Sequence, residues 1–277
     1  LHLDCWGNCH GILSRIRIYG MKVTVCEMPG DHSLFEDSWQ NLVNHVHEHG
    51  SDLVLLPEMP FHDWLAHTRD FDQGKWIEAV AAHQKWIERI GELGVDLVAA
   101  SRPEILDGKN QNIGFIWEKN SGIQDVHTKY YLPDDEGFWE ATWYERGDGT
   151  FKAVNTLKGK LGLLICTDMW FPQKARDYGQ DGVQILLIPR STPAGTTDKW
   201  LACARTNAVI SGAFCLSSNW GGTSPERGKF AGKGWIIEPE VGTVLGVTSP
   251  DEPLLTLNID LEKADAAKST YPRYVRD

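Results

Sequence analysis

The stretch LGLLICTDMW, residues 161–170, runs from aliphatic residues straight into Cys166, and a threonine, an aspartate and a tryptophan follow the cysteine closely. A short apolar run of this kind is typical of a strand that is buried on both faces. We therefore expect a strand at 160–166 that places the Cys166 thiol at its carboxyl end, where reactive groups gather in α/β folds. A helix is expected to begin at Pro172, because proline is tolerated in the first helical turn.

Similar apolar runs recur on both sides of this stretch and alternate with helical patterns. Further strands are predicted at 22–27, 51–57, 95–101, 183–189, 213–219, 233–240, 242–248 and 254–260. Amphipathic helices are predicted at 37–49, 74–94 and 198–212, and a hairpin is expected to turn at 120–122. Helices that alternate with buried strands, together with hairpins, indicate an α/β layered domain with one or two mixed sheets.

The composition fits one large globular domain. The chain has 277 residues, of which 42% are hydrophobic and 23% charged, and this suffices for a well-filled core. The net charge of −11 argues against nucleic acid or an anionic membrane as the main partner, because both attract basic surfaces. No apolar stretch approaches the ~20 residues needed to cross a bilayer. The six cysteines form no CxxC pair, which favours reduced thiols in a cytoplasmic enzyme.

The first 20 residues differ from the rest of the chain. They contain neither an initiator methionine nor an apolar signal core, whereas Met21 opens a clean strand pattern. We interpret residues 1–20 as a leader, tag or flexible arm and residues 21–277 as the folded domain. Cys5, Cys9 and His10 fall short of the four ligands of a structural zinc site, so we expect neither a metal nor another cofactor.

Three polar residues are expected directly after predicted strands. Glu58 follows DLVLLP (52–57), Lys129 follows IQDVHT (123–128), and Cys166 ends the strand described first. Taken singly, such a cysteine is most often a small buried hydrophobe, and the two charged residues would lie on the surface. Together they supply a thiol, a base and a cation, which are the groups that acyl transfer needs.

Three segments around these residues resemble a known family. LLPEMPF (55–61), KYYLPDDEGFWE (129–140) and LLICTDMWFPQKAR (163–176) are similar to the signature segments of the nitrilase superfamily, the carbon–nitrogen hydrolases. The resemblance implies a single-domain α-β-β-α sandwich with four layers. It also implies a homodimer or a higher homo-oligomer.

The resemblance further implies a Glu-Lys-Cys triad. Cys166 would be the nucleophile, Glu58 the general base and acid, and Lys129 the cation that supports the oxyanion. Glu140 matches a second glutamate of the family, and the backbone N–H of Thr167 would be a further oxyanion donor. These roles agree with thiol chemistry, since only a few per cent of a free thiol is ionised at neutral pH and a nearby carboxylate can accept its proton.

The residues after the cysteine indicate a branch of the family. Nitrile-cleaving members carry Trp-Glu there, whereas Thr167-Asp168 and the segment CTDMWFPQKAR (166–176) are more similar to amidases, above all the N-carbamoylputrescine amidases. This implies hydrolysis of a small amide or N-carbamoyl compound through a thioester, with release of ammonia or an amine. The alternatives are a nitrilase acting on a small nitrile, or a catalytically weak member that serves as a binding or scaffold protein.

Candidate substrate-binding residues lie in aromatic and polar segments near the triad positions. They are Trp139, Trp170, Phe171, Arg190 and Asn219. An Arg190 side chain that pointed into the pocket would favour a carboxylate-bearing substrate over a cationic diamine; the alternative is a surface arginine. The aromatic residues could equally pack in the core or at an interface.

Two other hydrolase classes find little support in the sequence. A papain-like thiol hydrolase could use His127, which lies near Lys129, but no cysteine stands at a helix start in the papain-like pattern. A metal hydrolase would need an HExxH or a similar ligand pattern, which the sequence lacks. Asp168 is expected to support the local backbone rather than to touch substrate.

Overall fold

A computed structural model describes residues 20–224 and 228–275 of the chain. The predicted arm at 1–20 lies outside the described residues except for Gly20, and so do Cys5, Cys9 and His10. The folded part opens with strand β1 (Met21–Pro29), which covers the first predicted strand.

Two sets of strands form the centre of the molecule and meet at β1. The first set is β2 (Leu53–Leu55), β3 (Leu97–Leu106), β4 (Lys109–Glu118), β5 (Gly122–Thr128) and β14 (Leu254–Ile259). The second set is β6 (Val154–Thr156), β7 (Gly159–Leu163), β8 (Ile185–Arg190), β9 (Phe214–Gly221), β12 (Trp235–Ile237) and β13 (Val244–Val247). The strand order is β5-β4-β3-β2-β1-β9-β8-β7-β6. β1 joins the sets because its first part pairs with β2 and β14, while residues 27–29 pair with β9.

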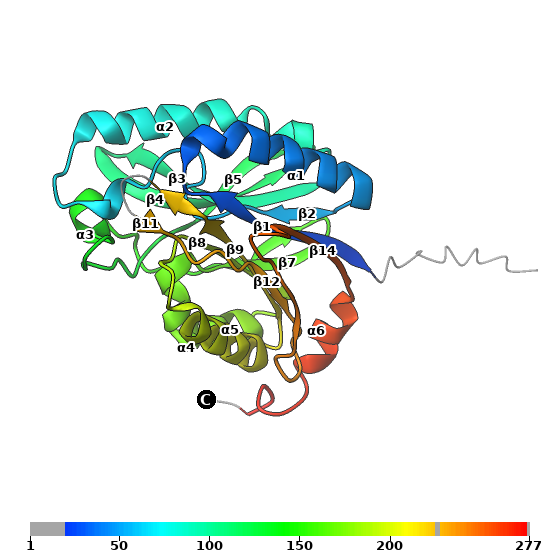
Figure 1. Ribbon diagram of the computed structural model, residues 1–277. Coiled ribbons are helices and arrows are strands. Elements are labelled where there is room, and N and C mark those ends of the chain that lie inside the picture. Colours follow the sequence, from blue (N-terminus) through cyan, green and yellow to red (C-terminus); the bar gives the residue numbers. More distant parts are fainter. Residues whose placement is uncertain (1–19, 225–227, 276–277) are drawn as a thin grey trace, which may run out of the picture.

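Helices cover both outer faces of the strands (Figure 1). On one face lie α1 (Phe35–His49) and α2 (Gln73–Ile87), and on the opposite face lie α4 (Pro172–Gln180) and α5 (Thr197–Ser211). The shorter elements are α3 (Glu140–Trp143), α6 (Leu261–Ala267), η1 (His32–Leu34), η2 (Leu65–His67), η3 (Ile90–Leu93), η4 (Cys166–Trp170), β10 (Thr223–Ser224) and β11 (Gly228–Lys229). The structure therefore has the predicted four-layer α-β-β-α arrangement.

The two strand sets pack face to face through an apolar core. Side chains of β1, β2 and β3, such as Val25, belong to the same buried cluster as Leu163 of β7 and Leu187 of β8. At Gly114 of β4 the layers approach so closely that a Cβ atom would come within 1.9 Å of the Leu163 side chain. A glycine at this position thus permits the sheet-to-sheet contact.

Three strands that precede the candidate triad residues run in the same direction. β2, β1, β9, β8 and β7 are parallel neighbours, and the two antiparallel steps from β3 through β4 to β5 restore that direction. The carboxyl ends of β2, β5 and β7 consequently lie along one edge of the strands. Reactive groups in α/β folds gather at such an edge.

The helical predictions hold with two changes. The segment predicted as one helix at 74–94 is divided into α2 and η3, and α3 and α6 were not predicted. In the described part of the chain, we find no helix whose length and apolar character would let it span a bilayer.

Candidate active site

A one-turn helix, not the end of a strand, carries Cys166. β7 ends at Leu163, three residues earlier than the sequence predicted, and Cys166 begins η4 with a φ of 48°. This left-handed conformation is strained for a residue with a side chain and is found mainly at functional sites. Asp168 holds the turn, because its carboxylate accepts a hydrogen bond from the Ile165 N–H at 3.2 Å and its own N–H donates to the Ile165 carbonyl at 3.0 Å.

Glu58 and Lys129 meet in a fully buried ion pair. Lys129 Nζ donates to Glu58 Oε1 at 2.7 Å, and both side chains are 0% exposed. Asn112 of β4 donates to the same oxygen at 2.8 Å. The backbone is fixed as well, because the Lys129 N–H donates to the Asn112 carbonyl and the Glu58 carbonyl accepts from the indole of Trp220.

Glu140 completes a cluster of two carboxylates around one ammonium group. It is the first residue of α3 and accepts hydrogen bonds from Lys129 Nζ and from the hydroxyl of Tyr144. Burial, opposed by the charge of Lys129 and reinforced by that of Glu58, raises the pKa of Glu140 from 4.5 to about 7. Burial alone would lower the pKa of Lys129, but the charges of Glu140 and Glu58 outweigh it and raise that pKa above its ordinary value. The lysine is therefore a permanent cation here.

The Cys166 thiol lies in the same electrostatic environment. It is 2% exposed, and it donates a long hydrogen bond to the Ser191 carbonyl at 3.9 Å. Burial, followed by the charge of Glu58, raises the pKa of the thiol well above its usual value, and the charge of Lys129 opposes this rise. The resting thiol is thus protonated and needs a base before it can attack. Among the described residues, Glu58 Oε2 and Glu140 Oε1 have no hydrogen-bond partner, so acceptors for such a proton are present.

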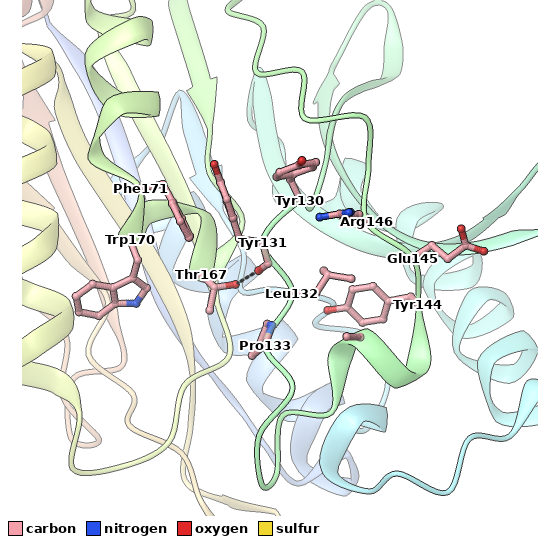
Figure 2. A pocket seen from close by; sticks show the side chains of 11 residues that line it. Tyr130, Tyr131, Leu132, Pro133, Tyr144, Glu145, Arg146, Thr167, Trp170 and Phe171 are labelled. Atoms are coloured by element: carbon pink, nitrogen blue, oxygen red, sulfur yellow. Dashed lines mark hydrogen bonds between the residues drawn. The ribbon is translucent and has the colours of Figure 1, made fainter.

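A cavity of about 670 Å³ lies beside this buried cluster (Figure 2). It is lined by Tyr130, Tyr131, Leu132, Pro133, Ala141, Tyr144, Glu145, Arg146, Thr167, Trp170 and Phe171. Cys166, Glu58 and Lys129 are not part of the lining; the cavity borders them through Thr167, the next residue after the cysteine, and Tyr144, which binds Glu140. The structure thus places Thr167, Trp170 and Phe171 at the cavity, as a substrate-binding role would require.

Three predicted substrate residues lie elsewhere. Arg190 is neither in the cavity lining nor on the surface, the two places that its sequence context suggested. It is 0% exposed because β8 is covered on both sides, and its guanidinium stacks 3.7 Å from the ring centroid of Trp235. Asn219 is also buried and binds Thr192 and the Gly232 carbonyl. Trp139 is half-buried under the guanidinium of Arg69, whose Cζ lies 3.7 Å from the ring centroid.

Several residues of the site were not predicted. Tyr130 and Tyr131 line the cavity, and their position directly after Lys129 was a signal that could have identified them. Asn112 gave no such signal, because it reaches the cluster from β4, which only the fold brings close. Tyr144 lies four residues after Glu140, and this helical spacing could have identified it. Within residues 20–224 and 228–275, no three His, Cys, Asp or Glu side chains gather as a metal site.

The raised pKa of Glu140 has a measurable consequence for stability. The folded state holds this proton more tightly than the unfolded chain, so it gains stability below the unfolded pKa of 4.5 and loses this gain as the pH rises through about 7. The loss amounts to roughly 3 kcal/mol at ~1.4 kcal/mol per pH unit. In urea unfolding, Glu140→Gln should therefore become more stable relative to wild type between about pH 5 and about pH 8.

The control for this measurement is Glu145→Gln, which neutralises an exposed carboxylate five residues further along the chain. Its stability relative to wild type should change little over the same range. A Glu140→Gln variant that tracked the control at both pH values would contradict the assignment of a proton-binding carboxyl to the buried cluster.

Comparisons of the sequence and of the structure with known proteins give matching results. A family model described as carbon-nitrogen hydrolase matches residues 22–269. An N-carbamoylputrescine amidase of Arabidopsis thaliana is 24% identical over 252 residues, which cover 84% of this chain and 83% of that protein. Among solved structures, a carbon-nitrogen hydrolase from Helicobacter pylori G27 has a TM-score of 0.81 at 23% identity, covering 92% of this chain and 94% of its own.

A further solved structure shows a mutant amidase from Nesterenkonia sp. AN1 with the acetamide moiety of fluoroacetamide added covalently at the active site cysteine. Its TM-score is 0.74 at 19% identity, and the superposition covers 91% of this chain and 94% of that chain. Both structural matches show that the fold is shared.

Proposed function

Because the chain belongs to the carbon–nitrogen hydrolase family, we propose that it hydrolyses a non-peptide C–N bond of a small amide or N-carbamoyl compound through a thioester on Cys166. The observation that carries this proposal is the buried cluster of Glu58, Lys129 and Glu140, whose charges all act on the Cys166 thiol. A nucleophile, a base and a fixed cation are thereby available in one site from which water is largely excluded.

The first step is attack of the thiol on the carbonyl carbon of the substrate. Glu58 takes the thiol proton as the C–S bond forms, since its Oε2 has no other partner among the described residues. The carbonyl oxygen becomes an oxyanion. Lys129 has three N–H donors, of which two are used by Glu58 and Glu140, so the third can bind this oxygen. The N–H of Thr167 is a second donor, because N–H groups in the first turn of a helix have no partner within the helix.

The second half of the reaction returns the enzyme to its starting state. Glu58 donates its proton to the nitrogen as the C–N bond breaks, so ammonia or an amine leaves and a thioester remains. The carboxylate then accepts a proton from water, whose oxygen attacks the thioester carbon, and the proton passes to the departing thiol. The net change is the addition of one water across the C–N bond, with no redox step.

Glu140 has a supporting part in this scheme. It accepts a second hydrogen bond from Lys129, which also donates to Glu58, and is itself held by Tyr144. Its second oxygen, Oε1, has no partner among the described residues, so it can accept a hydrogen bond from an N–H of the substrate. A substrate with hydrogen-bond donors on nitrogen, as in an amide or a carbamoyl group, suits this open acceptor better than a nitrile, which has none.

The comparisons support a substrate of this class. A relative with 24% identity is named for its action on N-carbamoylputrescine, and the Nesterenkonia amidase of the same fold bears an acetamide moiety on a cysteine. A panel of N-carbamoyl amines, N-carbamoyl amino acids, simple amides and nitriles, scored by ammonia release, tests the proposal. If nitriles gave the dominant signal, the proposed substrate class would be wrong. That result would not test the role of Cys166 as the nucleophile.

The charged residues of the cavity favour those substrates of the panel that carry a carboxylate. Arg146 lies in the lining, its Cζ is 5.3 Å from the ring centroid of Tyr130, and no carboxylate of the described residues pairs with it. Glu145 is instead bound to Lys109 at 3.1 Å. In Figure 2 the guanidinium of Arg146 points toward Tyr130, whereas the Glu145 carboxylate points away from the other labelled side chains. The cavity can therefore receive a carboxylate more readily than an ammonium group.

We expect amides and N-carbamoyl compounds that carry a carboxylate to give higher kcat/KM than N-carbamoylputrescine. Arg146→Gln should lower kcat/KM for the anionic substrates roughly tenfold, the worth of one exposed charge-assisted contact, and should leave neutral amides nearly unchanged. Glu145→Gln is the matched control, because it removes a neighbouring charge that faces Lys109. Equal losses for anionic and neutral substrates would show that Arg146 does not read the substrate charge.

A further inference from the structure

One buried contact links the segment that carries Lys129 to the segment that carries Cys166. His127 lies in β5, two residues before Lys129, and Asp168 lies in η4, two residues after Cys166. The Nε2 atom of His127 is 2.8 Å from Oδ2 of Asp168, and both side chains are 0% exposed. None of the steps proposed above uses this pair.

The Asp168 carboxylate gathers backbone groups from both segments. Its Oδ1 accepts hydrogen bonds from the N–H groups of Tyr130 at 3.2 Å and Tyr131 at 3.0 Å, the two residues that follow Lys129. Its Oδ2 accepts from the N–H of Ile165, the residue before Cys166, at 3.2 Å. One carboxylate therefore connects the residues next to the cation with the residue next to the thiol. A change in its charge or position would be felt at both.

His127 has an acceptor on each side of its ring. Its Nδ1 atom lies 3.1 Å from the Thr150 carbonyl oxygen, and its Nε2 atom faces Asp168. A ring N–H can donate to an acceptor of either kind. The ring therefore lies between the Thr150 backbone and the Asp168 carboxylate and links the two.

The surroundings of the pair contain few other charges. The ring of His127 packs on Phe151 with centroids 4.4 Å apart, and the Lys174 ammonium lies 4.8 Å from the centroid of the same phenylalanine ring. The phenols of Tyr131 and Tyr178 also interact electrostatically with Asp168. His127 is consequently the basic side chain that directly contacts Asp168.

We propose that His127 is a positioning residue that holds Lys129 and Cys166 in register through its contact with Asp168. The inference rests on the proposed function, but the residue touches no reacting atom. Without the ring, Asp168 loses its Nε2 partner and its link to the Thr150 backbone. Lys129 and the Cys166 thiol then lose their common anchor, and the chemical step slows while substrate binding is retained.

Two variants separate the hydrogen bonds of the ring from its shape. His127→Phe keeps an aromatic ring against Phe151 but removes both ring nitrogens, and His127→Gln keeps an N–H donor for Asp168. His127→Phe should lower kcat roughly 10- to 100-fold, as small misplacements of reacting groups do, with KM within about twofold. His127→Gln should recover a large part of kcat. His45→Gln on α1, whose ring contacts Thr256 of β14, is the control and should match wild type.

A readout independent of turnover keeps this inference distinguishable from the proposed function. The rate of Cys166 alkylation by iodoacetamide, followed by mass spectrometry over a pH series, reports the environment of the thiol even in a protein that hydrolyses nothing. His127→Phe should shift this profile toward higher pH, and His127→Gln should shift it less. Unchanged alkylation and kcat profiles in His127→Phe would overturn the proposal.

Discussion

Replacing Cys166 by alanine is expected to lower kcat by roughly 10⁵- to 10⁶-fold, as happens when a hydrolase of this kind loses its nucleophile. The remaining groups cannot substitute for the sulfur, because Glu58 and Lys129 bind each other and neither forms a covalent intermediate in the proposed reaction. The fold should survive, since alanine fills the same buried turn and the hydrogen bonds of Asp168 that hold it involve the backbone. Initial rates and the midpoint of thermal unfolding measure the two expectations together.

The control for this variant is Cys215→Ala. Cys215 is also a fully buried thiol, in β9, but the proposed reaction does not use it. Its truncation should reduce stability without lowering kcat more than a few-fold. Hydrolysis by Cys166→Ala at a tenth of the wild-type rate would refute the thioester. If wild type and variant were both inactive on every member of the panel, the protein would be a binding or scaffold member of the family.

The family could be predicted from short motifs, because these motifs contain the polar residues that lie at one edge of the strands. Glu58, Lys129 and Cys166 follow β2, β5 and β7, and these strands run in the same direction. The segments around the three residues resembled the nitrilase superfamily, and the family match over residues 22–269 confirms this. Local patterns were enough to predict the family, because each of the three segments comes shortly after a strand whose carboxyl end lies at this edge.

Arg190 shows where local patterns fail. Its place after a strand suggested a cavity wall or the surface, yet its guanidinium donates to Ser217 and to the Lys233 carbonyl and stacks on Trp235. These partners lie 27 to 45 residues away in the chain. They come close only because β8 pairs with β9, and β9 with β12. A buried arginine without a carboxylate next to it in the sequence could not have been distinguished from an exposed one.

The turn at the nucleophile and helix α3 were missed for a related reason. The apolar run 161–165 predicted a strand that continues to Cys166, but the Asp168 side chain binds the Ile165 N–H and bends the chain into η4. Likewise, no helix was predicted between β5 and β6, whereas a single turn of helix, α3, begins at Glu140 and directs it toward Lys129. Side-chain hydrogen bonds that compete with regular structure are weakly encoded in hydrophobic patterns.

Glu58→Gln is the sharpest test of the base. Glu58 uses only one oxygen for structure: Oε1 accepts from Lys129 at 2.7 Å and from Asn112 at 2.8 Å, whereas Oε2 has no partner among the described residues. A glutamine can keep both hydrogen bonds with its carbonyl oxygen and place its amide where Oε2 was. The site should therefore retain its geometry and lose only its proton acceptor.

We expect kcat for this variant to fall roughly 10²- to 10⁴-fold, the usual contribution of a general acid–base residue, with the unfolding midpoint close to wild type. The loss should exceed that of Glu27→Gln, which neutralises another buried glutamate whose partners, the Lys233 N–H and the Thr248 hydroxyl, lie outside the cluster. A Glu58→Gln enzyme that kept wild-type kcat would require another proton acceptor, and Glu140, with its raised pKa and its open Oε1, would be the group to examine.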